Sequence, residues 1–154
     1  FQLAVRRVPK DLPVYALTVA ESGSRLTKAE ISEPECASSG DCRRFIGGRM
    51  RGMRGDAVSL ADLAFALETW ADRPVLDQTA IEGLFVIRVR PFATLKPHLD
   101  DYLASVPLAQ QPPMEENLPS LASVLEKDFG LIFRRTRAQV ESLMIESAAR
   151  PTPN

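Results

Sequence analysis

Three carboxylates in one short segment are the side chains best placed for acid–base chemistry. Asp72, Asp77 and Glu82 follow an expected helix and surround a short expected strand, so the strand and its turn could bring two of them together. Two carboxyl groups can act as acid and base when their surroundings separate their pKa values. The structural alternative is that Asp77 and Gln78 satisfy turn backbone groups and that Asp72 pairs with Arg73 or caps its neighbours.

Other groups with catalytic potential are sparse. A serine or cysteine nucleophile needs a base beside it, most often histidine, and the chain has a single histidine, His98. It lies in a proline-rich connection, which favours a surface position. The acidic pairs 100–101 and 115–116 are adjacent residues, whose side chains point apart on most backbones. We therefore assign no catalytic residue, no metal ligand and no cofactor.

The two cysteines, Cys36 and Cys42, are separated by five residues in a polar segment. This spacing lets the two thiols meet across a tight loop, and a disulfide there would contribute roughly 2 kcal/mol by constraining the unfolded chain. A lone pair cannot complete a tetrahedral zinc site and lacks the spacing of redox enzymes. A structural disulfide implies an oxidising compartment outside the cytoplasm, whereas two free thiols would suit a cytosolic protein.

Two further features have both a binding and a structural interpretation. Trp70, near the end of an expected helix, can anchor a partner or simply cover the core. The arginine-glycine run at residues 47–55 can follow a phosphate backbone, but RNA-binding segments usually add stacking aromatics, and only Phe45 is near. We therefore interpret the run as a solvated loop.

Composition indicates a globular protein and excludes two classes of partner. Of 154 residues, 45% are hydrophobic, 25% are charged, and the net charge is −1. Such a chain has no overall field to attract nucleic acid, and no apolar run approaches the roughly 20 residues of a membrane span.

A helix at residues 59–71 is the clearest element. Leu60, Leu63, Ala64 and Leu67 repeat at helical spacing, and Ser59 with Asp62 forms a capping signal. The Arg73-Pro74 pair ends the helix, since proline disfavours helical geometry in the residue before it. Strands are expected at residues 75–77 and 84–89.

This helix and its strands are echoed later in the chain. Residues 120–147 predict a second helix that ends before Gly130, followed by a hairpin of residues 131–135 and 140–147. Residues 1–20 match that hairpin, with a turn at residues 9–12. No helix precedes this third copy, so we expect the chain to be the C-terminal fragment of a larger protein and to pack against its own missing N-terminal region.

The predicted fold class is α+β, with helix and hairpin units repeated along a mainly antiparallel sheet on which the helices pack. The expected order is ββ, loop, βαββ, loop, αββ. The units are a truncated hairpin at 1–20, a cysteine-containing loop at 21–56, repeats at 57–90 and 119–147, and a proline-rich connection at 91–118.

Several segments resemble the motifs of a large, soil-associated bacterial family of unknown function that is expanded in acidobacteria. Residues 73–89, RPVLDQTAIEGLFVIRV, are similar to its hallmark R-P-V-x-D-x-T-G-L-x-G-x-(Y/F). LPVYALTVAESGSRL, SLADLAFAL and MIESAARPTPN match further family segments in the same order. Ala80 and Arg43 stand where the family usually has glycine, and Glu82 stands where threonine is common. The resemblance implies an exported protein, with related domains sometimes attached to sensor metallopeptidases, and it implies no catalytic residues.

These observations give two hypotheses about function. The first is a non-enzymatic extracytoplasmic module, periplasmic or secreted, that presents sheet edges or a groove to a protein or cell-envelope ligand. Its candidate binding residues are Trp70, Asp77 and Glu82. The second is an envelope hydrolase that uses a carboxylate pair among Asp72, Asp77 and Glu82, which requires a pocket holding at least two of them.

Overall fold

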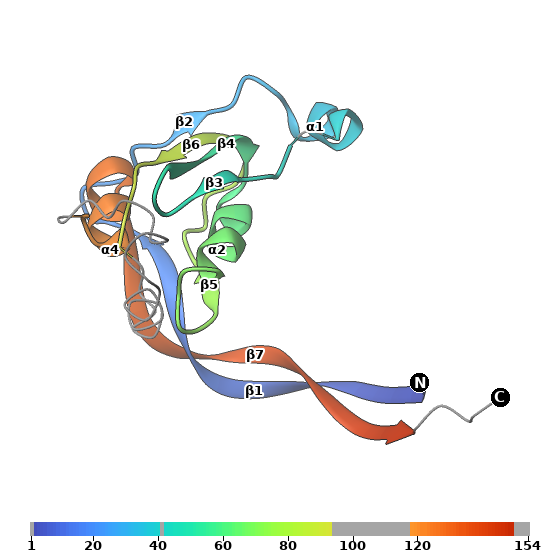
Figure 1. Ribbon diagram of the computed structural model, residues 1–154. Coiled ribbons are helices and arrows are strands. Elements are labelled where there is room, and N and C mark those ends of the chain that lie inside the picture. The colour runs from blue at the N-terminus through green and yellow to red at the C-terminus, as the bar shows by residue number, and fades with distance from the viewer. Residues whose placement is uncertain (1, 41, 94–117, 150–154) are drawn as a thin grey trace, which may run out of the picture.

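Within the described residues, the fold consists of two β-sheets and three helical segments. The computed structural model describes residues 2–40, 42–93 and 118–149. One sheet has the strand order β5-β1-β7 and the other β2-β6-β4-β3 (Figure 1). The elements are β1 Gln2–Val19, β2 Thr27–Lys28, α1 Glu33–Ser39, β3 Ile46–Gly48, β4 Gly52–Val58, α2 Leu60–Glu68, β5 Val75–Asp77, β6 Phe85–Val89, α4 Leu121–Val124 with its π-helical continuation η2 Leu125–Phe129, and β7 Leu131–Ala149.

The α+β class with mainly antiparallel pairing is confirmed. Among the described strands, every pair is antiparallel except β1 with β5, which run parallel over residues 15–17 and 75–77. A common core joins the two sheets to α2 and α4, so the described residues share one main hydrophobic cluster.

Helix α2 forms for the reasons that its sequence indicates. The Ser59 hydroxyl accepts a hydrogen bond from the Asp62 N–H at 3.1 Å, and the Asp62 carboxylate accepts one from the Ser59 N–H at 2.8 Å. This reciprocal cap satisfies donors that the first helical turn leaves free. Leu60, Leu63 and Leu67 are at most 1% exposed, and burying each such side chain contributes about 1.5–3 kcal/mol.

Gly130 closes the helical segment formed by α4 and η2 and brings the loop after β1 against it. Its φ of 67° lies in the left-handed region, and a Cβ added there would overlap the carbonyl oxygen of Gly23. On either side of this close approach, the Ala20 N–H donates to the Gly130 carbonyl at 2.9 Å and the Arg25 N–H donates to the Phe129 carbonyl at 2.8 Å. The helix end is therefore also the junction where β1 and β7 begin to pair.

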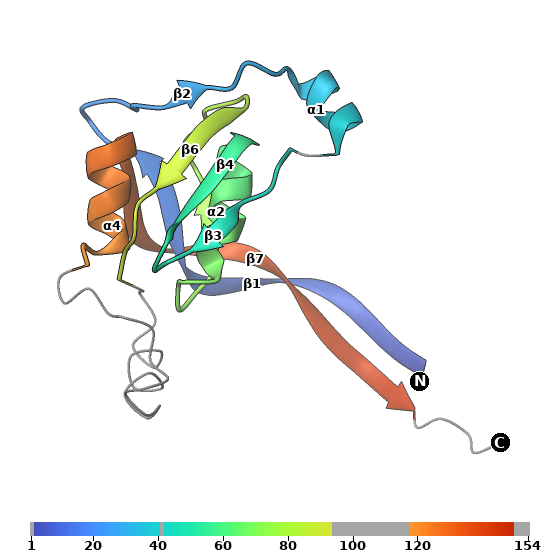
Figure 2. The ribbon, with the colours of Figure 1, turned by 45° about the horizontal axis from the view of Figure 1, so that its top comes forward.

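Each of the two predicted hairpins at residues 1–20 and 131–147 is wrong, because each segment is one continuous strand. Strand β1 pairs with β7 from Gln2–Ala149 to Val19–Leu131. Beyond the body of the protein the two strands continue alone as a long twisted ribbon, with the start of β1 and the end of β7 together at its far tip (Figures 1 and 2). The likeness between the two segments is that of two partner strands, and the repeat order is not confirmed.

The direction of the backbone groups in the ribbon follows from one hydrogen bond. The pair Ala20–Gly130, just beyond the strands, is hydrogen-bonded, and such pairs alternate along an antiparallel ladder. From Val5 to Val19, the even-numbered residues of β1 therefore bond to β7, and the odd-numbered ones turn their N–H and C=O groups outward. Tyr15 agrees, since its N–H donates away from the ribbon to the Pro74 carbonyl at 2.8 Å.

This alternation explains why the turn predicted at residues 9–12 does not form. Pro9 and Pro13 are odd-numbered residues of β1, so neither occupies a position whose N–H bonds to β7. Proline is tolerated at such positions of an edge strand because no ladder hydrogen bond is lost. The prolines that indicated a turn instead lie in an uninterrupted strand.

The helix-hairpin predicted at residues 57–90 also needs correction. Strands β5 and β6 do not form a hairpin, because β5 pairs with β1 in one sheet and β6 pairs with β4 in the other. The segment between them therefore crosses from one sheet to the other. Residues 21–56 are not a loop either, since they contain β2, α1, β3 and the start of β4. The arginine-glycine run forms the β3–β4 hairpin.

Most of the proline-rich connection, with His98 and both adjacent acidic pairs, lies outside the described residues. Among the described helices, none is long and apolar enough to span a membrane.

We expect Gly130→Ala to lower the free energy of unfolding by roughly 3 kcal/mol, because the new Cβ meets both a left-handed backbone and a fixed carbonyl oxygen. Gly40→Ala is the matched control. Gly40 also follows a helix with a positive φ, 69°, but it faces open space, so its substitution should cost only about 1 kcal/mol. Urea denaturation of both variants measures the difference, and equal losses would contradict the tight approach of Gly23.

Candidate functional site

The end of β5 and the crossover that leads to β6 carry two of the three candidate carboxylates, and Asp77, the last residue of β5, is used structurally. Its Oδ1 accepts hydrogen bonds from the Thr79 N–H at 3.0 Å and from the Thr79 hydroxyl at 2.7 Å. The Thr79 hydroxyl in turn accepts from the Ile81 N–H at 3.2 Å. Net contributions of such bonds are about 1 kcal/mol each. The expectation that Asp77 satisfies turn backbone is confirmed.

Asp72 is held by its neighbour, as the structural alternative predicts. The Arg73 guanidinium lies 2.8 Å from an Asp72 carboxylate oxygen and 5.2 Å from the centre of the Tyr15 ring. The hydrogen bond from Arg73 keeps the pKa of Asp72 below its usual range. A carboxylate held in its charged form in this way is poorly suited to donate a proton at neutral pH.

Asp77 and Glu82 do line one cavity, an open one of about 550 Å³ that Asp72 does not reach. Glu33 joins them from α1, a helix that the sequence analysis did not predict, and Glu33 itself forms an ion pair with Arg43. Within the described ranges, no group of three histidine, cysteine, aspartate or glutamate side chains could hold a metal ion. The cavity therefore collects acidic side chains without bringing them to a common metal.

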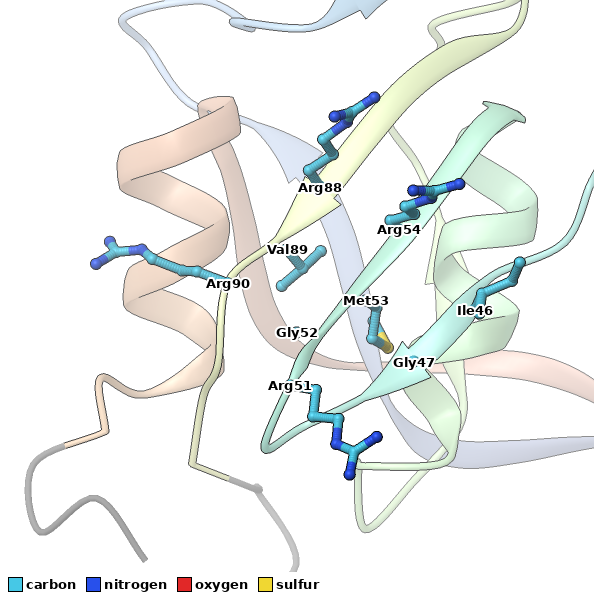
Figure 3. Close-up of a pocket in the computed structure, with 9 residues that line it drawn as sticks. All are labelled: Ile46, Gly47, Arg51, Gly52, Met53, Arg54, Arg88, Val89 and Arg90. Atoms are coloured by element: carbon cyan, nitrogen blue, oxygen red, sulfur yellow. The ribbon is translucent and has the colours of Figure 1, made fainter.

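A second open cavity, of about 420 Å³, is lined by four arginines on the β3–β4–β6 face. Figure 3 shows Arg51, Arg54, Arg88 and Arg90 pointing in different directions rather than toward one point. Arg54 and Arg88 both pair with Asp56, at 3.3 and 3.4 Å. Arg90 pairs with Asp128, at 2.8 Å. The arrangement spreads positive charge over the surface and forms no cradle for an anion.

Trp70 packs within the protein. Its ring meets Phe92 edge-on with 6.1 Å between ring centres, and it also lies beside Gly48. Trp70 is half-buried against the main core. It therefore covers the core, which is the structural interpretation given by its sequence position.

The two thiols are neighbours, and no disulfide joins them in this structure. Cys36 is buried in α1, and Cys42 is half-buried. A hydrogen bond with Cys42, together with burial, raises the pKa of the Cys36 thiol to about 11. The Ser39 hydroxyl lies 3.4 Å from the Cys42 sulfur. The cysteines therefore lie within hydrogen-bonding reach of each other in the folded chain.

The outer edge of β7 is the surface that sequence reasoning missed. Strand β7 ends its sheet, and no described strand pairs with its second edge. Its odd-numbered residues from 131 to 145 face odd-numbered residues of β1, so by the same alternation they turn their N–H and C=O groups outward. The open edge of β1 carries Pro9 and Pro13, whereas residues 131–149 contain no proline. Strand β7 thus offers a long, unblocked template for another strand.

Exposed apolar side chains lie along the same ribbon. Leu143 is 67% exposed, Ile145 63% and Val5 48%. Ile145 is the cross-strand partner of Val5, so these two lie on one face, and Leu143 is two residues along the same face. The signal for this surface was present in the sequence, because residues 136–139, TRAQ, hold none of the glycine, proline, asparagine or aspartate that a hairpin turn favours.

Comparison with known protein families identifies the family of this chain. The model of the family described as a protein of unknown function, DUF3738, matches residues 1–148. The chain belongs to the DUF3738 family. No curated protein and no solved structure matches it. The resemblance to a family of unknown function is thus confirmed, while an origin among soil bacteria and export stay predictions.

In this DUF3738 chain, the two residues that replace a motif glycine share one backbone feature, a positive φ. Ala80 has a φ of 55° and Arg43 a φ of 58°, and they are the two non-glycine residues with positive φ in the described ranges. The motifs that this chain resembles usually have glycine at these two positions. Glycine adopts this conformation without the cost of about 1–2 kcal/mol that a Cβ introduces.

We therefore expect Ala80→Gly to raise the free energy of unfolding, by about 0.5–1 kcal/mol, because relief of the left-handed strain exceeds the entropy added to the unfolded chain. Ala80 is exposed, so no packing is lost. Ala66→Gly within α2 is the control and should lower stability by about 1 kcal/mol. Chemical denaturation measures both, and a loss at both positions would contradict the strained turn.

Proposed function

We propose that this protein is a non-enzymatic binding module that takes an extended segment of a protein partner onto the open edge of β7. The observation that carries the proposal is the outer edge of this 19-residue strand, with which no described strand pairs, while the other edge of the ribbon is blocked by proline. Main-chain hydrogen bonds along such an edge supply affinity, and contacts with alternate side chains supply specificity.

The ribbon has the physical properties of an incomplete sheet. A two-stranded ribbon by itself is only marginally stable in water, and a third strand adds both hydrogen bonds and apolar contact. Leu143 and Ile145, both more than 60% exposed, supply apolar surface for the added segment. The ion pairs that cross the ribbon, such as Arg6–Glu146 and Arg137–Asp11, are exposed and contribute at most about 1 kcal/mol each.

The hydrolase alternative is supported only by the shared cavity of Asp77 and Glu82. Asp77 is occupied by its turn, and Asp72 lies elsewhere, paired with Arg73. Hydrolysis of an envelope polymer that is lost in Glu82→Gln would favour the enzyme over the binding module. Glu82 is suited to that test because it is exposed and lines the cavity.

We further propose an extracytoplasmic location, supported by the proximity of Cys36 and Cys42. In an oxidising compartment two neighbouring thiols with little other chemistry form a structural disulfide. The raised pKa of the Cys36 thiol, to about 11, keeps it protonated and slow to react in the reduced protein near neutral pH. Oxidation would therefore depend on an oxidising environment rather than on an activated thiolate.

Strand capture is tested with two proline variants. Gln139 turns its N–H outward on β7 and Arg7 does so on β1, so each substitution spares the β1–β7 ladder and blocks one edge. We expect tagged wild type and Arg7→Pro to retain the same protein from periplasmic or culture fractions of the native host, and Gln139→Pro to lose it. The identified protein should then bind saturably in calorimetry. Retention by all three chains, or by none, would argue against the β7 edge.

The location is tested by thiol titration. Protein secreted by its native host, denatured without reductant, should contain no free sulfhydryl, and reduction should lower the free energy of unfolding by about 2 kcal/mol. The double variant Cys36→Ser, Cys42→Ser should match the reduced protein and not respond to reductant. Two titratable thiols per chain would remove the argument for an oxidising compartment.

A further inference from the structure

We infer that the partner strand on the β7 edge is β7 of a second copy of this chain, paired antiparallel about a two-fold axis. This inference rests on the proposed function and names the occupant of the same edge. A two-fold interface uses one surface twice, so β7 must be complementary to its own reversed sequence.

Charge along β7 has the required asymmetry. Arg134, Arg135 and Arg137 lie in the first half of the strand, and Glu141 and Glu146 lie in the second half. Antiparallel pairing of two copies brings the basic half of each against the acidic half of the other, whereas parallel pairing would place like charges side by side. Arg134 and Arg135 form no ion pair with any described residue, so they are available to a partner.

The backbone alternation limits the possible registers. Outward N–H and C=O groups belong to odd-numbered residues of β7, so odd residues must face odd residues in the two-copy ladder. This leaves registers in which the axis passes through a residue of β7. We compare those with the axis at Ala138, Gln139 or Val140, because they retain the longest overlap.

The register about Ala138 matches side chains best. It places Phe133 opposite Leu143, Arg135 opposite Glu141 and Ile132 opposite Met144 of the second copy. Apolar residues thus meet apolar ones, and the one charged pair joins opposite signs. The register about Gln139 instead places Arg135 opposite Leu143, and that about Val140 places Arg137 there.

The exposed side chains of the ribbon fit this arrangement. Leu143 is 67% exposed in the single chain, and the second copy would cover it with Phe133, which already packs on the core beside Tyr15. The ladder over residues 133–143 would add about a dozen main-chain hydrogen bonds, since each hydrogen-bonded pair exchanges two. The two ribbons would become the centre of one continuous sheet, with a protein body at each end.

The association state of the full chain is the first test. We expect sedimentation equilibrium to give twice the monomer mass of 17.0 kDa. Gln139→Pro should raise the dimer dissociation constant by at least about tenfold, because it removes a central N–H from the edge. Arg7→Pro, the same change on the opposite edge, should leave it unaltered. A monomer at all accessible concentrations, or a dimer insensitive to Gln139→Pro, would overturn the inference.

A cysteine placed on the axis tests the register. Ala138→Cys should form an intermolecular disulfide under mild oxidation, since facing residues in a non-hydrogen-bonded pair have Cα atoms about 4.5 Å apart, within disulfide range. Leu12→Cys is the control, because Leu12 is the cross-strand neighbour of Ala138 on the same face of the ribbon but lies on β1. The parent chain reports any linkage through its own cysteines. Equal crosslinking at positions 12 and 138 would overturn the register.

A charge exchange provides a complementary test. Arg135→Glu and Glu141→Arg should each weaken the dimer, and the double exchange should restore it, because the register faces these two residues across the axis. Failure of the double variant to recover would contradict that register. A monomeric chain that still captures another protein in a Gln139-dependent way would remove the second copy and leave the proposed function standing. A chain that does neither would remove both.

Discussion

The pairing of β1 with β7 is the constraint on which the rest of the structure depends. It joins the first and last described strands over nearly their whole lengths, and β5 adds to the sheet only at residues 15–17 of β1, near the end of that strand. Helix α4 with η2 leads directly into β7 through Gly130, and the loop after β1 packs against that same residue. Pairing β1 with β7 closes a loop that contains nearly the entire chain, so the entropy of loop closure is lost before most of the stabilising contacts form. We therefore expect folding to be slow relative to helical proteins of this size.

The sequence predicts the elements whose signals are local, and it misleads where the decisive contact is distant. Ser59, Asp62 and Gly130 mark helix ends through bonds within a few residues, and the structure forms both helices there. Whether Pro9 interrupts a strand depends instead on which way its backbone nitrogen faces, and that is set by a partner strand more than 120 residues away. Local propensity contains no information about such a contact, so it indicates a turn where the structure has a continuous ribbon.

The candidate carboxylates show the same limit for a site. Sequence proximity suggested that Asp72, Asp77 and Glu82 act together, and the structure does bring Asp77 and Glu82 to one cavity. In the same structure, Asp77 forms hydrogen bonds within its own turn, and Asp72 forms an ion pair with Arg73. Spacing along the chain indicates which side chains are near one another, but not whether their hydrogen-bonding capacity is already used.

Function in this fold is therefore best sought where bonding capacity is unused. The D-x-T segment of the crossover resembles a family hallmark, yet its Asp77 and Thr79 satisfy each other and the backbone between two sheets, so the motif is explained by architecture. The outward N–H and C=O groups of β7 satisfy no described strand, and Leu143 and Ile145 stand exposed beside them. Natural edge strands are normally blunted by proline, inward charge or short length, and β1 carries the first of these devices. Strand β7 lies in the same ribbon and carries no proline, and this difference between the two edges supports the proposed capture of another strand.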